Sequence, residues 1–203
     1  MHPNTDTQQR ILDSARELIY SRSYADVGVA DICEHAGVKK GSFYHFFPSK
    51  RDLTLAVLDN YFIEIKTNLV AEAFAKDIPP LARLDRFGQM AYMFQKQVQK
   101  DTGRVLGCPF GNLAGEMATQ DEPIRAKIEQ IFSNLQAGIR LVLREAVDAG
   151  ELEDIDVEAT AQAMLAYFEG VMLLAKSKND VEILGQLFPA MSQIRISPRK
   201  ASA

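Results

Sequence analysis

The fold is decided by residues 23–59, which read SYADVGVADICEHAGVKKGSFYHFFPSKRDLTLAVLD. A short helix is expected over about residues 29–35, and Gly37 then provides the turn conformation that residues with a Cβ atom resist. A second short helix is expected over residues 39–47, because Pro48 disfavours helical geometry at the residue before it. Two short helices joined by a glycine-containing turn are typical of a helix-turn-helix.

Longer helices are expected on both sides of this pair. On the N-terminal side, Thr5 followed by Gln8 resembles a capping box, and apolar residues recur at spacings of three and four up to residues 20–23. On the C-terminal side, Ser49 and Asp52 resemble the N-cap and first-turn acid of a long helix. The apolar face of the first helix consists of Ile11, Leu12, Ala15, Leu18 and Ile19.

The rest of the chain shows the same helical spacing and no alternation of β-branched residues that would indicate strands. The sequence therefore predicts an all-α protein of about nine helices. The tail after residue 194 is expected to be disordered. The further helices are expected at about residues 81–100, 109–118, 121–150, 156–177 and 180–194.

The composition is typical of a soluble globular protein, with 203 residues of which 47% are apolar and 25% charged. The longest apolar stretches, such as residues 171–175, fall far short of the roughly 20 residues that a membrane-spanning helix needs. The N-terminus, MHPNTDTQQR, lacks the basic and apolar regions of a secretory signal. We therefore expect a cytoplasmic protein that makes no use of a membrane.

The cysteines and histidines predict neither a disulfide framework nor a metal site. Cys33 and Cys108 are far apart, and His2, His35 and His45 have no spacing that would gather them around a metal ion. We expect Cys33 and His35 to pack within the helix-turn-helix instead. Ser/His/Asp arrangements, paired carboxylates and phosphate-binding loops are not evident, so we expect no cofactor and no catalytic residues. A helical enzyme and a purely structural interaction module are the alternative classes.

The charge distribution points to a nucleic-acid partner more than the net charge of −4 does. Residues 37–51 hold four basic residues and no acidic one. On a helix over residues 39–47, Phe43 and either Phe46 or Phe47 can face the core together with Val38. A recognition helix must present hydrogen-bond donors to base edges and phosphates. The residues left toward solvent or a DNA groove are Lys39, Lys40, Ser42, Tyr44 and His45.

A set of residues in this stretch has the order and spacing of a known module: Ile32, Ala36, Gly37, Val38, Gly41, Phe43, Tyr44, Phe46, Phe47, Lys50 and Leu53. With them, residues 23–59 resemble the N-terminal domain of the tetracycline-repressor family. One departure concerns residues 27–29, where Val-Gly-Val replaces the Thr or Ser that usually stands there. A hydroxyl contact to a DNA phosphate is therefore not expected at this point.

The resemblance implies roles for individual residues. It implies base-reading or near-base positions for Lys39, Lys40 and Ser42. It implies contacts to the DNA backbone for Tyr44, His45 and Lys50.

The resemblance also implies an organisation and a function. Residues 1–48 are expected to form a helix-turn-helix domain that binds double-stranded DNA, and residues 49–203 a domain that binds a ligand and dimerises. A homodimer would place two recognition helices about one DNA turn apart, which predicts a near-palindromic operator. Most of the family represses transcription until a small-molecule or electrophilic effector releases the protein from DNA; activation is the alternative.

Cys108 is a candidate sensor of an electrophile or oxidant. Residues 107–117, GCPFGNLAGEM, resemble the start of the ligand domain in a subgroup of these repressors, some of which sense such molecules through the cysteine. If Pro109 is the first residue of a helix, Cys108 stands at its N-cap, where the positive end of the helix favours a thiolate. The alternative is that Cys108 is a small buried residue.

A non-covalent effector pocket is the second possibility for the C-terminal domain. Ligand pockets are lined by apolar side chains with a few polar groups that fix the ligand. The polar candidates are Tyr92, Asn112, Glu116, Gln136 and Tyr167.

The last two predicted helices carry apolar faces that either close the core of the monomer or, by resemblance, pack against their copies in a four-helix bundle. These faces consist of Ala163, Ala166, Tyr167, Gly170, Leu173 and Leu174, then Ile183, Leu184, Leu187, Phe188 and Met191.

Overall fold

The protein is described here by a computed structural model that places residues 3–198, with side chains from residue 6 onward. All regular secondary structure in this described range is helical, so the expectation of an all-α fold is confirmed. The elements are α1 (Pro3–Ser21), α2 (Val29–Ala36), α3 (Lys40–Phe46), α4 (Lys50–Ile65), η1 (Lys66–Val70), α5 (Ala71–Ala73), α6 (Pro80–Thr102), α7 (Pro109–Met117), α8 (Glu122–Asp148), α9 (Val157–Lys178), α10 (Glu182–Leu187) and η2 (Phe188–Gln193).

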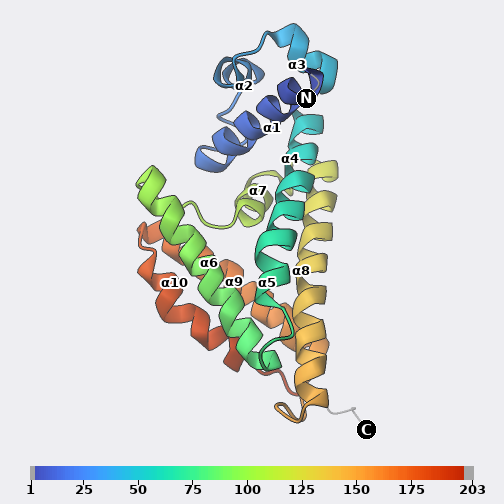
Figure 1. Cartoon of the computed structure of the whole chain (residues 1–203), viewed down its shortest axis with the longest axis vertical. Coiled ribbons are helices and arrows are strands. Elements are labelled where there is room, and N and C mark those ends of the chain that lie inside the picture. The colour runs from blue at the N-terminus through green and yellow to red at the C-terminus, as the bar shows by residue number, and fades with distance from the viewer. Residues whose placement is uncertain (1–2, 199–203) are drawn as a thin grey trace. The chain divides into compact units, whose positions relative to one another are not determined.

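The chain divides into two compact units (Figure 1). The first consists of Met1–Ile63 and Pro109–Glu129, and the second of Glu64–Cys108 and Gln130–Ala203. α7 and the beginning of α8 therefore belong to the same compact unit as α1, α2 and α3. The functional boundary expected at residue 48 stays a prediction.

The core of the first unit is built from residues of α1, α2, α3 and α4. The side chains of Ile11, Ile32, Phe43 and Leu53 are fully buried, and Phe47 is only 5% exposed. Burial of this kind is worth about 1.5–3 kcal/mol for each large apolar side chain. The core therefore fixes α3 against the rest of the helix-turn-helix, as the sequence predicted.

The turn between α2 and α3 is closed by Gly37 and by Arg10 of α1. Gly37 has φ = 62°, in the left-handed region, and its N–H group reaches the carbonyl of Glu34. The Arg10 guanidinium donates to the carbonyl oxygens of Ala36 and Gly37. This long-range brace, across 26 and 27 residues of chain, holds the angle between the two short helices.

The start of α4 is capped as the sequence predicted. The backbone N–H of Asp52 donates to the Ser49 hydroxyl at 3.1 Å, and that hydroxyl donates to the Asp52 carboxylate at 2.6 Å. Because the cap stands directly after Pro48, it fixes where α3 ends and α4 begins.

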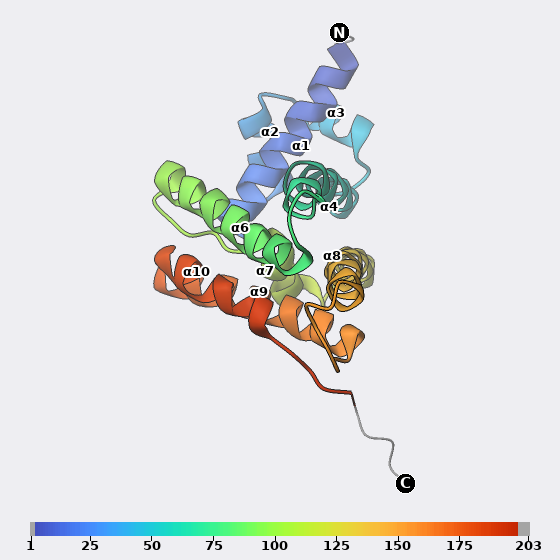
Figure 2. The same ribbon diagram turned by 60° about the horizontal axis from the view of Figure 1, so that its bottom comes forward.

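The second unit is organised around stacked aromatic rings of α6, α9 and η2. The ring centroids of Phe87 and Phe168 lie 5.1 Å apart, and those of Phe168 and Phe188 lie 4.9 Å apart. A Cβ atom added to Gly88 would stand 3.0 Å from the Cβ of Phe188, so this glycine permits the close approach of α6 and η2. Figures 1 and 2 both show α6, α9 and α10 side by side.

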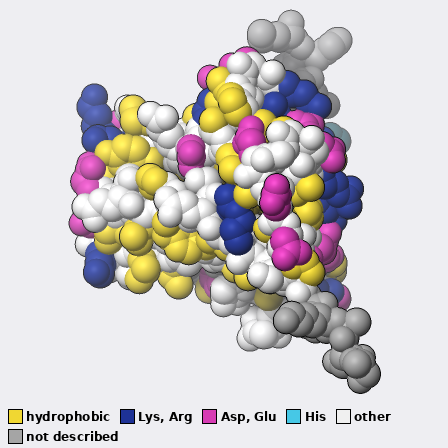
Figure 3. Space-filling view, turned by 90° about the horizontal axis from the view of Figure 1, so that it is seen from below, with side chains coloured by type: hydrophobic (Ala, Val, Ile, Leu, Met, Phe, Trp, Pro, Cys, Tyr) yellow, Lys and Arg dark blue, Asp and Glu magenta, His cyan; other side chains and the backbone are white. Residues whose placement is uncertain are grey.

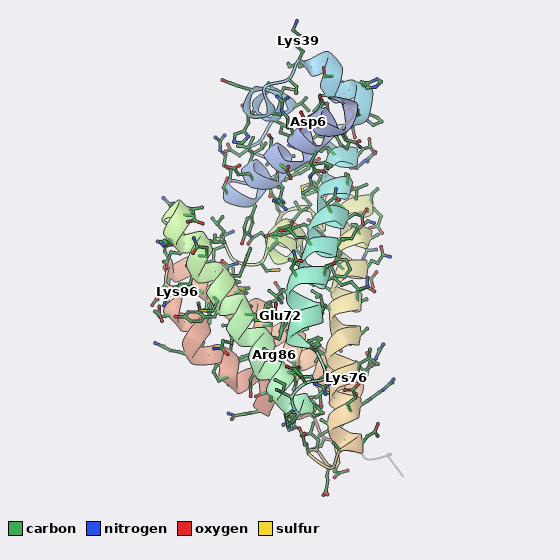
Figure 4. The ribbon with its side chains drawn as sticks, in the orientation of Figure 1. Asp6, Lys39, Glu72, Lys76, Arg86 and Lys96 are labelled. Carbon is green, nitrogen blue, oxygen red and sulfur yellow. The ribbon has the colours of Figure 1, made fainter. Side chains whose placement is uncertain are left out.

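Two arginines of α6 tie its beginning to neighbouring segments of the second unit. Arg83 is only 6% exposed, donates to the carbonyl of Ile78 and pairs with Glu145 of α8 at 2.5 Å. Arg86 donates to the carbonyls of Ala73 and Ala75, and it pairs with Asp77 at 2.8 Å. Figure 4 shows Arg86 and Lys76 close to the point where α5 leads into α6.

Three features differ from the sequence-based expectations. α1 begins at Pro3, so Thr5 lies inside the helix instead of capping it, because the polar residues before Thr5 also adopt helical geometry. The long helix after Ser49 contains a π-helical turn over Lys66–Val70, for which the spacing of apolar residues gave no signal. Pro189 cannot donate to a helical ladder, and the last helix continues as a 3₁₀ helix from Phe188.

The beginning of the C-terminal tail is also ordered. The N–H of Ile196 donates to the Thr160 hydroxyl at 3.1 Å, and the N–H of Asp156 donates to the Ile196 carbonyl at 2.7 Å. The disorder expected after residue 194 is therefore wrong for the residues up to 196, because the tail satisfies free groups at the start of α9. The rest of that expectation, over residues 199–203, lies outside the described residues.

Candidate nucleic-acid interface and ligand site

α3 has two opposite faces. Phe43 is fully buried and Phe47 almost so, while Val38 and Phe46 pack partly against the same core. This division confirms which residues face inward. The remaining side chains, Lys39, Lys40, Tyr44 and His45, are exposed, and Ser42 is half-buried.

The exposed face of α3 combines two ammonium groups with an aromatic ring and an imidazole. Lys39 stands at the N-cap of the helix, and Figure 4 shows its side chain pointing away from the ribbon. The side chain of Tyr44 is 54% exposed although its ring meets that of Phe43 edge-on at 5.1 Å. On a short cationic helix, an exposed tyrosine can donate a hydrogen bond from its hydroxyl group to a DNA phosphate.

Lys50 differs from the exposed Lys39 and Lys40 because it is half-buried and contacts another part of the first unit. Its ammonium group donates to the carbonyl oxygen of Tyr24 at 2.5 Å and lies 4.0 Å from the centroid of the Tyr24 ring. Burial lowers the pKa of Lys50, against the opposing effect of the Glu116 and Asp31 carboxylates. One donor of this predicted phosphate contact is therefore already used within the first unit.

The beginning of α2 has no side-chain cap. Gly28 occupies the N-cap, and its N–H donates to the carboxylate of Asp31 at 2.6 Å, while Val27 is fully buried. The missing hydroxyl at residues 27–29 is therefore replaced by apolar packing.

Cys33 and His35 were both expected to pack within the helix-turn-helix. Cys33 does so, being 4% exposed, and burial raises the pKa of its thiol. The expectation is wrong for His35, whose side chain is 41% exposed and lies 3.7 Å from the Glu17 carboxylate. The turn to Gly37 leaves the end of α2 with a solvent-facing side on which His35 stands.

Glu116, on α7, contacts the loop between α1 and α2. Its carboxylate accepts hydrogen bonds from the N–H groups of Tyr24 at 2.9 Å and of Ala25 at 2.6 Å. Sequence reasoning placed this residue among the polar groups of an effector pocket. In the structure both of its oxygens are occupied by the first unit.

The chain matches two family models that together cover most of its length. Residues 11–57 match the model of bacterial regulatory proteins of the tetR family. Residues 80–191 match the model of the tetracyclin repressor-like C-terminal domain, which is more than half of the chain. The chain belongs to the tetracycline-repressor family of transcriptional regulators.

Individual relatives in this family agree with the models. The chain is 33% identical, over 90% of each sequence, to an uncharacterized HTH-type transcriptional regulator in the lacX 3′ region of Lactococcus lactis subsp. lactis. It is 35% identical to the transcriptional regulator AcuR of Cereibacter sphaeroides, over 83% of this chain and 75% of AcuR. The crystal structure of regulatory protein TetR from Rhodobacter sphaeroides superposes with a TM-score of 0.81 at 32% identity, covering 93% of this chain and 98% of that one.

This tetracycline-repressor family member carries its candidate sensor, Cys108, in the second unit. The cysteine directly precedes α7, as predicted, and is 7% exposed. Its thiol is hydrogen-bonded to the carboxyl group of Glu169 on α9. The Glu169 Oε1 atom is buried and has no hydrogen-bond partner among the described residues.

Glu169 was not singled out from the sequence, although a signal existed. It is the one charged residue in the stretch MLAYFEGVMLLA, residues 164–175. Burial raises the pKa of this carboxyl group to about 7, and the hydrogen bond from Cys108 opposes the rise. The group thus changes its charge near neutral pH in direct contact with the candidate sensor.

Tyr92 lies beside a small pocket between α6 and α10. The pocket has a volume of about 320 Å³, and its lining includes Gly88, Tyr92, Gly185 and Phe188. The Tyr92 hydroxyl donates to Glu182 at 2.8 Å and accepts from Lys96 at 2.8 Å. The polar residues of the pocket lining are therefore Asp85, Gln89 and Tyr92, and Tyr92 in turn contacts Lys96 and Glu182.

The other polar candidates have separate partners. The Gln136 amide donates to Glu158 at 2.7 Å, and the Tyr167 hydroxyl donates to the carbonyl of Leu187 at 2.8 Å. Asn112 lies on α7, in the first unit, and is half-buried. The predicted effector residues thus have different partners and are not gathered in one pocket. Their common role in binding an effector stays a prediction.

Of the residues predicted for the dimer faces, some are buried within the second unit and others are exposed. Leu184, Phe188 and Met191 are buried within the second unit, so for them the alternative, closing the core of the monomer, is correct. On α9, by contrast, Leu173 is 65% exposed and Leu174 is 47% exposed. Figure 3 shows that hydrophobic side chains gather on the face viewed there, between basic and acidic ones.

Within residues 3–198, each helix is too short or too polar to cross a membrane. Within the same range, histidine, cysteine and carboxylate side chains form no group of three that would hold a metal ion.

Proposed function

We propose that this regulator is a cytoplasmic repressor that binds a near-palindromic operator as a homodimer and leaves it when an effector acts on the second unit. The observation that carries the proposal is the division of α3 into a buried aromatic face and an exposed face with Lys39, Lys40, Tyr44 and His45. A rigid, cationic helix of this length fits the major groove.

Within the interface, Lys39, Lys40 and Ser42 read bases, and Tyr44, His45 and Lys50 contact the DNA backbone. Lys39 and Lys40 stand at the N-terminal end of α3, which is the end that recognition helices direct toward base edges. Lys50 stands at the start of α4, where free backbone N–H groups also favour a phosphate.

The homodimer is supported by the exposed apolar side chains of α9. Ala166, Gly170, Leu173 and Leu174 are all exposed, at helical spacing along one side of the helix. Large apolar residues exposed together are typical of a protein–protein interface, and small residues among them allow close packing of helices.

The effector is proposed to be a small molecule or an electrophile that acts at Cys108. The support is the contact between the buried Cys108 thiol and the Glu169 carboxyl group, whose Oε1 atom is buried and which can accept the thiol proton. The pocket beside Tyr92 is the non-covalent alternative, because it offers apolar walls with a polar edge.

The assignment of roles in α3 and α4 is tested with a duplex selected from a random library by the wild-type protein. Lys50→Ala should weaken binding to all duplexes alike and reduce the slope of log affinity against log salt by about two, one for each subunit, whereas Lys40→Ala should reduce discrimination between selected and unselected duplexes. The reverse pattern would contradict the assignment. Affinities are measured by fluorescence anisotropy over a series of salt concentrations.

A further inference from the structure

We propose that two carboxylates beside the helix-turn-helix, Glu116 and Asp121, form a latch that holds the cationic start of α4 in position for DNA. The latch rests on the function proposed above, because it deepens the regulation of the same DNA interface. It makes α7 the element whose position sets the strength of DNA binding.

The first half of the latch is the contact of Glu116 with the loop between α1 and α2. Both oxygens of its carboxylate accept backbone hydrogen bonds, from Tyr24 and from Ala25. Hydrogen bonds to a charged acceptor are stronger than those between neutral groups. The loop has no regular helical ladder of its own, so this residue of α7 decides where the Tyr24 peptide lies.

The Tyr24 peptide in turn positions Lys50. Its N–H group donates to Glu116, and its carbonyl oxygen accepts from the Lys50 ammonium group at 2.5 Å. The Tyr24 ring lies beneath the same ammonium group, 4.0 Å away. One residue therefore stands between a carboxylate of α7 and the cation predicted to bind a phosphate.

The second half of the latch reaches the next cation along the chain. Asp121 lies 3.6 Å from the Arg51 guanidinium, and its side chain is only 15% exposed. The Asp121 carboxylate also accepts from the N–H of Ile124 at 3.1 Å, which fixes it at the start of α8. An isolated ion pair at the surface contributes little, but this one joins a fixed acid to the neighbour of Lys50.

The two contacts converge on Lys50 and Arg51, and both start from the segment that begins with α7. α7 starts at Pro109, the residue after the candidate sensor Cys108. A displacement of α7 would therefore move the Tyr24 loop and release two adjacent cations from their positions. An effector can bring about this displacement only if it binds the displaced state more tightly.

The decisive experiment is a double-mutant cycle on DNA affinity. Glu116→Ala removes both loop hydrogen bonds, and Glu116→Gln keeps one acceptor while removing the charge. We expect Glu116→Ala to lower affinity for the selected duplex about fivefold to tenfold, the size of one impaired phosphate contact, and Glu116→Gln to lower it less. In a Lys50→Ala background, Glu116→Ala should change affinity less than about twofold, because the two residues act in series.

A matched control separates the latch from a general effect of charge. Glu122→Gln removes one negative charge from an exposed acid of α8 that pairs with Arg125, and it should leave DNA affinity unchanged. Hydrogen exchange tests directly whether Glu116 holds the loop between α1 and α2 in place, which a binding measurement does not show. The amides of Tyr24 and Ala25 should exchange about tenfold faster or more in Glu116→Ala, while amides in the α1 core keep the wild-type rate.

The outcomes separate the latch from the proposed function. If the wild-type protein selects no duplex, the proposed function is wrong and the latch has no role to play. If the wild-type protein binds DNA but Glu116→Ala and Lys50→Ala are fully additive, or Glu116→Ala binds like wild type, the proposed function stands and the latch is wrong. If Glu116→Ala unfolds the α1 core, Glu116→Gln decides by the same measurements.

Discussion

The carboxyl group of Glu169 on α9 is hydrogen-bonded to the thiol of Cys108, the residue that precedes α7. Burial raises the pKa of the carboxyl group to about 7, although the thiol hydrogen bond favours the carboxylate. The Glu169 carboxyl group therefore gains or loses its charge in the physiological pH range, next to the Cys108 thiol inside the second unit.

The raised pKa of Glu169 makes the stability of the protein depend on pH. The folded state binds the proton more tightly than the unfolded chain, so this carboxyl group reduces stability as the pH rises from about 4.5 through 7. Glu169→Gln should be more stable than wild type at pH 8, by about 3 kcal/mol at most, with the gain disappearing near pH 4.5. Urea unfolding of both proteins at the two pH values measures this. A gain of equal size at both pH values would contradict the raised pKa.

A covalent effector should act through Cys108. We expect N-ethylmaleimide to modify Cys108 and to lower affinity for the selected duplex about tenfold or more, because an adduct beside Glu169 cannot fit the present packing. Mass spectrometry locates the adduct, and Cys108→Ser is the control that should keep its affinity after treatment. If Cys108→Ser loses affinity to the same extent, the effector site is elsewhere and the Tyr92 pocket becomes the candidate.

The turn of the helix-turn-helix should tolerate no side chain at Gly37. Its positive φ and the Arg10 Nη2 atom, which would lie 3.0 Å from an added Cβ, both oppose substitution. Gly37→Ala should lower the free energy of unfolding by about 1–2 kcal/mol. Gly41→Ala is the matched control: open space surrounds its Cβ position within α3, so this variant should be as stable as wild type or more stable. Equal losses in the two variants, measured by urea unfolding, would show that neither φ nor Arg10 matters.

Substitution of two neighbouring aromatic residues of α3 should change stability to very different extents. Phe43 is fully buried, so Phe43→Ala should cost about 3–5 kcal/mol of unfolding free energy and abolish DNA binding with it. Tyr44 is 54% exposed, so Tyr44→Ala should change stability by about 0.5 kcal/mol or less while still weakening DNA binding. Thermal unfolding and anisotropy on the same samples check both. A stable Phe43→Ala protein that binds DNA normally would contradict the description of the core.

The sequence predicted those features of the fold that are determined locally. α2 and α3 lie within a residue or so of their expected bounds because Gly37 and Pro48 limit them, and Ser49 caps α4 as its spacing to Asp52 indicated. The inward positions of α3 followed from helical periodicity alone. The exposed face of α3, which is proposed to contact DNA, was predictable for the same reason, since a short helix with a buried phenylalanine has only one other face.

Contacts between residues that are far apart in the sequence could not be predicted from local patterns. Glu116 binds a loop 92 and 91 residues earlier in the chain, and no local pattern distinguishes such a glutamate from a polar residue that lines a pocket. For the same reason, the sequence did not predict the hydrogen bond from Arg10 to the carbonyl of Ala36, 26 residues away. Glu169 did leave a signal, a lone acid in an apolar stretch, but only the fold shows that Cys108 faces it.

The most direct test of the proposed role of α3 is the salt dependence of DNA binding by the purified wild-type protein. With Lys50 from each subunit of a dimer neutralising a phosphate, log affinity for the selected duplex should fall against log salt with a slope of about −2 or steeper. A dimer that binds with this slope, and prefers the selected duplex over a scrambled one, is the expected result. A monomeric protein without affinity for duplex DNA in dilute buffer would contradict the assignment of α3 as the recognition helix.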